Sequence, residues 1–148
     1  MNKLFIFDLD GTLANLDHRI SLVKNNIGVK DWPKFFENCD KDKVNDWVAD
    51  LFRMVKPHGE ILILSGRSHE ALEKTKKWLI SNNIMYDYIA LRPPKDYRPD
   101  EIVKLEMLEE FLRDKDYKVQ FIVDDRQKVV DMWRANGYNV LQCNAWEE

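Results

Sequence analysis

Acidic and basic residues that could do chemistry together directly follow three short apolar segments of the 148-residue chain. Asp8 and Asp10 follow the first segment, Ser65-Gly66-Arg67 follows the second, and Asp124-Asp125-Arg126 follows the third. Four carboxylates brought together would repel one another by several kcal/mol at an effective dielectric of about 20, unless a cation held them. Oxygen ligands without histidine or thiolate favour Mg²⁺ over zinc, and Mg²⁺ held by few carboxylates usually acts beside a phosphate. The pattern therefore predicts a magnesium site formed by Asp8, Asp10, Asp124 and Asp125.

The Ser65-Gly66-Arg67 turn has the residue types of an anion site. The Ser65 hydroxyl and the free backbone N–H groups at the start of a following helix would bind phosphate oxygens, and Arg67 could add a bidentate contact. Explanations without a functional role also remain open for these residues. Asp-Gly at residues 10–11 is a common turn signal. Arg67 could be a solvated surface residue, and Lys104 could be a solvated lysine on an amphipathic helix.

Apolar segments rich in β-branched and aromatic residues must position these groups, and we predict that they are strands. Four are clear, and Tyr86 to Leu91 is a weaker candidate; the four are Lys3 to Phe7, Glu60 to Leu64, Lys118 to Val123 and Tyr138 to Cys143. Three of them are apolar without alternation, as expected of strands that helices bury on both faces. Strands alternating with helices predict an α/β fold with a Rossmann-like, doubly wound parallel sheet. Ligands bind such a sheet outside the carboxyl ends of its strands.

Residues with helical period separate the predicted strands. Their apolar positions predict helices within residues 44–55, 68–79, 100–111 and 129–136. Ser68 and Asp100 are the expected N-caps of the second and third helices, and Gly137 should end the fourth. Residues from about 15 to 43 do not fit the alternation and are predicted to be a small insertion, with Trp32, Phe35 and Phe36 in a short extra helix. We expect residues 1–148 to form one domain with minimal cap insertions.

Composition excludes several classes of protein. With 45% hydrophobic and 11% aromatic residues, the chain is not a disordered linker. No run of about 18 apolar residues suggests a membrane span, and the apolar segment before Asp8 is too short for a signal peptide. Cys39 and Cys143 lack the spacing of a zinc site and fit free thiols in a cytoplasmic protein. A net charge of −3 argues against binding through broad phosphate neutralisation.

Taken in order, the chemical residues resemble the four motifs of the haloacid dehalogenase superfamily of phosphotransferases. The matching residues are Asp8-Leu9-Asp10-Gly11-Thr12, Ser65-Gly66-Arg67, Lys104 and Asp124-Asp125. From Lys3 to about Gln142 the chain is similar to the 3′-phosphatase domain of bacteriophage polynucleotide kinase-phosphatase. Arg19, Arg67 and Asp100 also agree with functional residues of that family. The resemblance implies a haloacid dehalogenase-like fold, Mg²⁺ as cofactor, and the 3′-phosphate end of DNA or RNA as substrate.

The resemblance also implies a role for each matching residue. Asp8 would be the nucleophile that forms an aspartyl-phosphate, and Asp10 would protonate the leaving hydroxyl and then activate water. Mg²⁺ would bind Asp8, the backbone carbonyl of Asp10, and the Asp124 and Asp125 pair. The residues implied in phosphate or substrate binding are Thr12, Arg19, Ser65, Gly66, Arg67, Lys104 and Asp100, the last by orienting Lys104.

Substrate choice is the feature that the resemblance determines least. Residues 29–38 look inserted relative to the family, and the loop from Leu91 to Pro99 shares little identity with it; both flank the predicted site. No P-loop motif occurs among the five glycines, so we do not expect ATP-dependent kinase activity, and a separate kinase or ligase could be a partner. Two alternatives remain: a phosphatase acting on nucleotides or sugar phosphates, and a non-catalytic binding domain.

Overall fold

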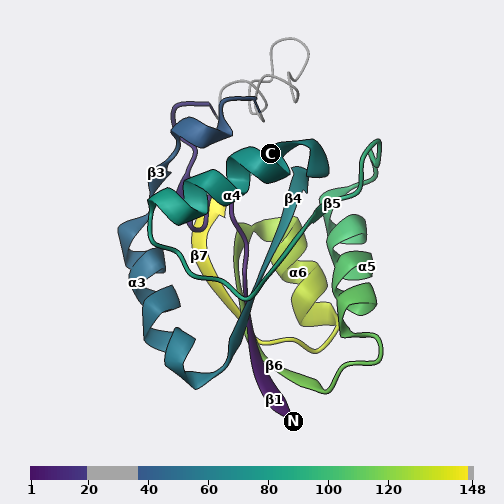
Figure 1. The fold of residues 1–148 in the computed structure, drawn as a ribbon. Helices are drawn as coiled ribbons and strands as arrows, with labels where there is room; N and C mark the ends of the chain where they lie inside the picture. The colour runs from purple at the N-terminus through teal and green to yellow at the C-terminus, as the bar shows by residue number, and fades with distance from the viewer. Residues whose placement is uncertain (20–36, 147–148) are drawn as a thin grey trace.

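The centre of the molecule is a five-stranded sheet in which all neighbouring strands run parallel (Figure 1). The computed structural model describes residues 1–19 and 37–146. The strands are β1 (Asn2–Phe7), β4 (Glu60–Ser68), β5 (Tyr88–Arg92), β6 (Tyr117–Arg126) and β7 (Val140–Trp146). All five segments predicted from the sequence, including the weaker one, are confirmed as strands, and the α/β class is confirmed with them.

Four helices of the described chain match the predicted ones, with small differences at their starts. They are α3 (Asp46–Val55), α4 (Leu72–Ser81), α5 (Asp100–Leu112) and α6 (Gln127–Ala135), accompanied by the 3₁₀ helices η1 (Cys39–Lys41), η2 (Lys56–His58) and η3 (His69–Ala71). Ser68 accepts a hydrogen bond from the Glu70 backbone N–H and so caps η3, which leads into α4. Asp100 is the first residue of α5 and not its N-cap, which is Pro99, because the Asp100 carboxylate binds Arg92 instead.

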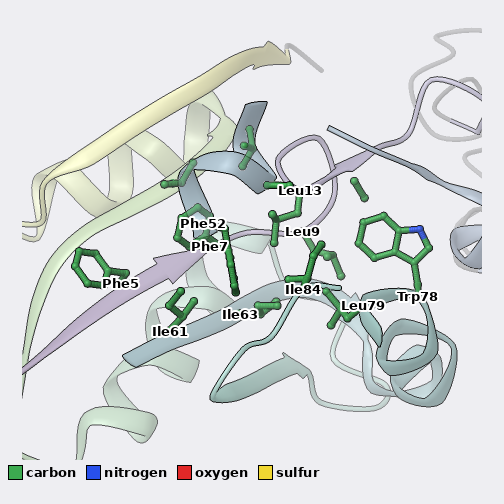
Figure 2. Packing of buried hydrophobic residues seen from close by; sticks show 14 residues of the cluster. Phe5, Phe7, Leu9, Leu13, Phe52, Ile61, Ile63, Trp78, Leu79 and Ile84 are labelled. Atoms are coloured by element: carbon green, nitrogen blue, oxygen red, sulfur yellow. The ribbon is translucent and has the colours of Figure 1, made fainter. Parts of the chain in front are cut away.

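Alternate residues of β1 enter two separate hydrophobic layers. Phe5 and Phe7 pack with α3 and α4 on one face of the sheet, where the ring centroids of Phe7 and Phe52 lie 5.0 Å apart (Figure 2). Leu4 and Ile6 pack with α5 and α6 on the opposite face. Since helices cover both faces, the strand is apolar without alternation.

The order of the strands determines where a ligand can bind. The sheet has the order β5-β4-β1-β6-β7. The chain therefore builds outward from β1 through β4 to β5, and then returns to the other side of β1 to form β6 and β7. In such a sheet the ligand crevice lies outside the carboxyl ends of the strands, where the order reverses. Register irregularities interrupt the ladder at these ends, between Ser65 and Ser68 and between Asp124 and Arg126, and bulges of this kind re-aim side chains next to active sites.

The segment predicted as an insertion begins and ends on a second, two-stranded sheet. There β2 (Ala14–Asn15) pairs antiparallel with β3 (Lys43–Val44), a pairing that the sequence did not predict and that takes Val44 out of the predicted helix. The predicted short helix with Trp32, Phe35 and Phe36 lies outside the described residues.

Within residues 1–19 and 37–146, no helix combines the length and the apolar character needed to cross a membrane.

Ile63 tests the central position of β4 in the core. It is completely buried and is paired in register with Phe7 on one side and Ile89 on the other. We expect Ile63→Ala to lower the free energy of unfolding by about 2 to 5 kcal/mol, because it removes buried methylene groups and leaves a cavity. Met54→Ala is the control; Met54 is 68% exposed, and a change of less than about 0.5 kcal/mol is expected. Urea unfolding followed by circular dichroism measures both variants, and equal losses would contradict this core.

Candidate active site

Three carboxylates meet at the carboxyl ends of β1 and β6. The Asp8 backbone N–H donates to the Val123 carbonyl at 2.9 Å, so the parallel pairing continues one residue beyond β1. This pairing places Asp8 beside Asp124 and Asp125, and carboxylate oxygens of the three residues lie within 4.8 Å of one another. All three side chains are buried. The structure thus brings together three of the four carboxylates that were predicted to converge.

Lys104 supplies the positive charge that faces this acidic cluster. From α5, its Nζ donates to Asp8 Oδ1 at 2.9 Å and to Asp124 Oδ2 at 3.1 Å, and it lies 3.8 Å from Asp100 Oδ2. Its side chain is 2% exposed, so Lys104 is not a solvated helix lysine. Burial by itself would lower the pKa of Lys104, but the three carboxylates outweigh burial and raise the pKa well above its usual value.

One lysine does not balance the charge of the cluster. Burial raises the pKa of Asp8, and the neighbouring Asp124 raises it further. The same two causes raise the pKa of Asp125 to about 7. A bound cation would relieve both the repulsion and the cost of burial, and three carboxylates form a donor set of the kind that Mg²⁺ prefers. The cluster therefore fits a magnesium ion.

The Gly11-Thr12 turn closes over the acidic cluster. Gly11 has a φ of +77°, and a Cβ at this position would clash with the Asp125 carboxylate, so conformation and space both require glycine. The Thr12 hydroxyl lies 3.2 Å from Asp8 Oδ2 and 3.4 Å from Asp125 Oδ1. Cys143 Sγ donates to the same hydroxyl at 3.5 Å. Thr12 therefore positions carboxylates, with its side chain completely buried.

Asp10 lies apart from the cluster, which corrects the expectation that four carboxylates converge. Its Oδ1 accepts hydrogen bonds from Arg19 Nη2 and Arg67 Nη2, each at 2.5 Å. Both guanidinium groups are buried, so neither arginine is a solvated surface residue. Burial alone would raise the pKa of Asp10, but the charges of Arg67 and Arg19 outweigh it and hold the pKa below its usual range. Asp8 and Asp10, two residues apart, have opposite pKa shifts.

Asp42 is a buried residue of the site that the sequence did not reveal. Its Oδ1 accepts from Arg19 Nε at 2.7 Å, and its Oδ2 accepts from Arg19 Nη2 at 2.6 Å. His18 Nε2 lies 2.6 Å from the same Oδ1. The Trp78 indole N–H donates to the Asp42 carbonyl at 2.8 Å and ties this residue to α4. Asp42 falls in the segment predicted as an insertion, where no motif or period marked it.

The Ser65-Gly66-Arg67 turn follows the apolar part of β4. Ser65 Oγ accepts a hydrogen bond from the Arg67 backbone N–H at 3.0 Å. The Arg67 guanidinium also donates to Thr75 Oγ1 at 2.9 Å, and its burial excludes the solvated alternative. A Cβ at Gly66 would clash with the Asp100 carboxylate. Glycine therefore lets Asp100, from α5, approach the turn closely.

Two arginines that were not among the predicted site residues hold Asp100. Arg92 Nη2 donates to Asp100 Oδ1 at 2.8 Å, and Arg126 Nη1 lies 3.4 Å from Asp100 Oδ2. Burial alone would raise the pKa of Asp100, but Lys104, Arg126 and Arg92 together lower it. The position of Arg126, directly after the Asp124-Asp125 pair, could have marked it. Nothing local marked Arg92.

These groups surround a cavity of about 720 Å³ at the carboxyl edge of the sheet. Of the predicted site residues, those that line the cavity are Asp8, Asp10, Ser65, Gly66, Arg67, Asp100, Lys104 and Asp125. Thr12, Arg19 and Asp124 are buried behind this lining. The volume is typical of a small-molecule cleft, and the lining combines a buried carboxylate with cationic groups. Such a cavity can bind a phosphate next to Asp8.

Solved structures share this fold. A putative phosphatase from Clostridium difficile aligns with a TM-score of 0.66 at 17% identity, over 98% of this chain and 88% of that chain. The haloacid dehalogenase-like hydrolase SP0104 from Streptococcus pneumoniae aligns with a TM-score of 0.63 at 14% identity, over 96% of this chain and 84% of that chain. At these identities the similarity shows the fold, which is that of the haloacid dehalogenase-like proteins, as predicted.

The comparison with protein families is more specific than the comparison of folds. A family model of the polynucleotide kinase PNKP phosphatase domain matches residues 2–147. The chain therefore belongs to the PNKP phosphatase domain family and is a phosphatase domain by membership. A chain of the Pnkp1/Rnl/Hen1 complex is 34% identical, with a TM-score of 0.84, over 100% of this chain and 48% of that chain. The present chain thus spans about half the length of that solved chain.

The acidic cluster makes the stability of the metal-free protein depend on pH. The pKa of Asp125 is about 7 in the folded state and about 3.9 in an unfolded chain, so the folded state binds more protons between these values. Stability is therefore greatest at low pH within this window and is lost as pH rises towards about 7. We expect Asp125→Asn to remove a difference on the order of a few kcal/mol between pH of about 5 and about 7.

Guanidinium unfolding in EDTA at the two pH values measures this difference. Asp50→Asn is the matched control, since Asp50 is 66% exposed on α3 and should leave the pH dependence of wild type in place. A pH dependence that is the same in Asp125→Asn and wild type would contradict the raised pKa.

Proposed function

We propose that the chain removes a 3′-phosphate from the end of a nucleic acid, with Asp8 as the nucleophile. The observation that carries the proposal is the position of Asp8, which lines the cavity while Lys104 holds one of its oxygens at 2.9 Å. Membership of the PNKP phosphatase domain family supports the substrate class. A similar chain belongs to the Pnkp1/Rnl/Hen1 RNA repair complex, which supports action beside other repair proteins, such as a separate kinase or ligase. Residues 1–148 would form the single domain that does this chemistry.

In the first step, a carboxylate oxygen of Asp8 attacks the phosphorus, and the bond from phosphorus to the 3′-oxygen breaks. The product is an aspartyl-phosphate on Asp8. Lys104 neutralises charge on the phosphoryl oxygens, and the Ser65 hydroxyl, whose oxygen accepts from the Arg67 backbone N–H, donates to another of them. Asp10 gives a proton to the leaving 3′-oxygen.

Asp10 must gain a proton before it can act as an acid. In the structure Arg67 and Arg19 hold its pKa low, so the free site keeps it ionised. A phosphate in the cavity would bring negative charge towards Asp10, whose side chain is 18% exposed, whereas the side chains of Arg67 and Arg19 are buried. Negative charge close to a carboxylate raises the pKa of Asp10. Substrate binding thereby prepares the acid.

In the second step, water attacks the phosphorus of the aspartyl-phosphate. Asp10, a carboxylate after the first step, accepts the proton of that water. The bond between phosphorus and the Asp8 oxygen breaks, and inorganic phosphate leaves with the Asp8 carboxylate restored.

The residues that would hold Mg²⁺ are Asp8, Asp124 and Asp125, with the backbone carbonyl of Asp10 as a further ligand. When bound, the cation would supply positive charge to the phosphoryl oxygens. The proposal of magnesium dependence rests on the buried acidic cluster, whose charge Lys104 alone does not balance.

Turnover by the purified chain with Mg²⁺ tests the proposed reaction. We expect Asp8→Asn to lower kcat by at least about 10³-fold, because it removes the nucleophile while keeping its shape. Asp50→Asn, on the exposed face of α3, should turn over like wild type. EDTA should abolish wild-type activity and added Mg²⁺ should restore it. Near-normal turnover by Asp8→Asn would rule out the aspartyl-phosphate.

The same assay separates the substrate classes. Wild type should have a kcat/KM at least about 10-fold higher on a 3′-phosphorylated RNA or DNA oligonucleotide than on a 3′-mononucleotide, since binding energy from the chain adds to that of the phosphate. Equal values would favour a small-molecule phosphatase. No turnover of any phosphate ester with Mg²⁺ present would favour a non-catalytic binding domain.

Arg19 acts through Asp10 in this proposal and does not touch the substrate. Arg19→Ala removes the charge-assisted hydrogen bond that positions the Asp10 carboxylate, and this loss of position should lower kcat about 10- to 100-fold. Because the effect passes through Asp10, the loss should be equal on an oligonucleotide and on an aryl phosphate. Arg53→Ala, on α3 and 48% exposed, is the control. A larger loss on the oligonucleotide would show that Arg19 contacts the nucleotide instead.

A further inference from the structure

An exposed aromatic ring stands at the rim of the catalytic cavity. The loop of residues 93–99 joins β5 to α5 and extends beyond the carboxyl end of the sheet (Figure 1). Tyr97, in this loop, lines the same cavity as Asp8. Its side chain is 90% exposed, more than any other large aromatic among the described residues. Tyr97 therefore combines high exposure with a place in the lining of the cavity that Asp8 also lines.

The loop that carries Tyr97 is held in place by two arginines. Arg92 donates to the Gly66 carbonyl at 2.9 Å, to the Asp96 carbonyl at 2.9 Å and to the Arg98 carbonyl at 2.7 Å. Arg98 in turn pairs with Asp96 at 2.8 Å. Through Arg92, the backbone on both sides of Tyr97 is thereby linked to Gly66 near the end of β4. An exposed ring on a fastened loop loses little conformational entropy when a ligand covers it.

The fold itself gives Tyr97 no packing role. In the part of the chain that the structure describes, no aromatic ring stacks on it, whereas Tyr88 packs edge to face against Phe111 with ring centroids 5.0 Å apart. Lys95, two residues earlier, has a φ of +61°, a conformation that is unfavourable for a residue with a side chain. The loop thus keeps an uncommon backbone conformation and presents its ring to solvent at the cavity.

We propose that Tyr97 is the stacking platform for the nucleobase next to the phosphate that is removed. The inference rests on the proposed function, because the phosphate must lie at Asp8 and Lys104 for the adjoining nucleoside to reach the rim. Aromatic side chains bind single-stranded ends by stacking on unpaired bases, with little dependence on sequence. Lys74 and Lys95 line the same cavity and add positive charge beside a polynucleotide backbone. The substrate class is therefore a single-stranded end whose last base is free to stack.

Two matched substrates test the platform. One is a single-stranded oligonucleotide that ends in a 3′-phosphorylated nucleotide, and the other is the same chain with a tetrahydrofuran in place of the last nucleoside, so that only the base is missing. We expect Tyr97→Ala to reduce the ratio of kcat/KM between the base-bearing and the abasic substrate about 5- to 150-fold. Tyr97→Phe keeps the ring and should keep the ratio within about 2-fold of wild type.

Trp47→Ala is the matched control, since Trp47 is an aromatic residue 54% exposed on α3 that does not line the cavity. It should leave the ratio as in wild type. An unchanged ratio in Tyr97→Ala, or an equal drop in Trp47→Ala, would overturn the platform. Wild-type turnover of the base-bearing oligonucleotide reports on the proposed function separately. Good turnover of it, together with an unchanged ratio in Tyr97→Ala, rejects the role of Tyr97 alone. If wild type turns over mononucleotides but not the oligonucleotide, the proposed substrate class is rejected.

Discussion

Three carboxylates buried within 4.8 Å of one another are the constraint on which the rest of the site depends. Two adjacent parallel strands place them there, because β1 and β6 end side by side and their pairing continues through Asp8. Like charges in a buried position oppose folding unless positive charge meets them. Lys104, on α5, supplies one positive charge to the cluster. The negative charge of the three carboxylates still exceeds it unless a cation binds. Gly11 is glycine because Asp125 occupies the space that a side chain would need.

The protein separates two chemically identical side chains by their surroundings. Burial and the neighbouring Asp124 raise the pKa of Asp8, whereas Arg67 and Arg19 outweigh burial at Asp10 and lower its pKa. The surroundings thus give one residue type two protonation states, and a cation beside Asp8 would return that carboxyl to its ionised form. Asp42 completes this arrangement, because it fixes Arg19 and is itself anchored to α4 through Trp78. The surroundings of Asp10 therefore depend on Arg19 and Asp42, two buried residues that do not line the cavity.

The distribution of charge fits recognition of a chain end. A net charge of −3 gives no broad basic surface, and lysine and arginine residues, Lys104 among them, line one cavity together with carboxylates. A phosphate at an end can enter this cavity, whereas a continuous backbone needs a long basic track. In the proposed function, contact with the rest of the substrate falls to the rim, where the loop of residues 93–99 lies. The proposed chemistry and the proposed substrate contact thus lie in different elements, the strand ends and a connecting loop.

The sequence by itself determined the five strands, the four main helices and the motif residues. The spacing of hydrophobic residues and the order of motifs along the chain can both be read from the sequence without a structure. It also placed Asp8, Asp124 and Asp125 together, since carboxyl ends of parallel strands share an edge. Only the tertiary structure decided that Asp10 pairs with Arg19 and Arg67, that Asp42 and Arg92 belong to the site, and that Tyr97 faces the cavity. These contacts join residues as far as 57 positions apart. Which of several arginines and carboxylates become partners depends on how loops cross the sheet edge, and no local pattern carries that information.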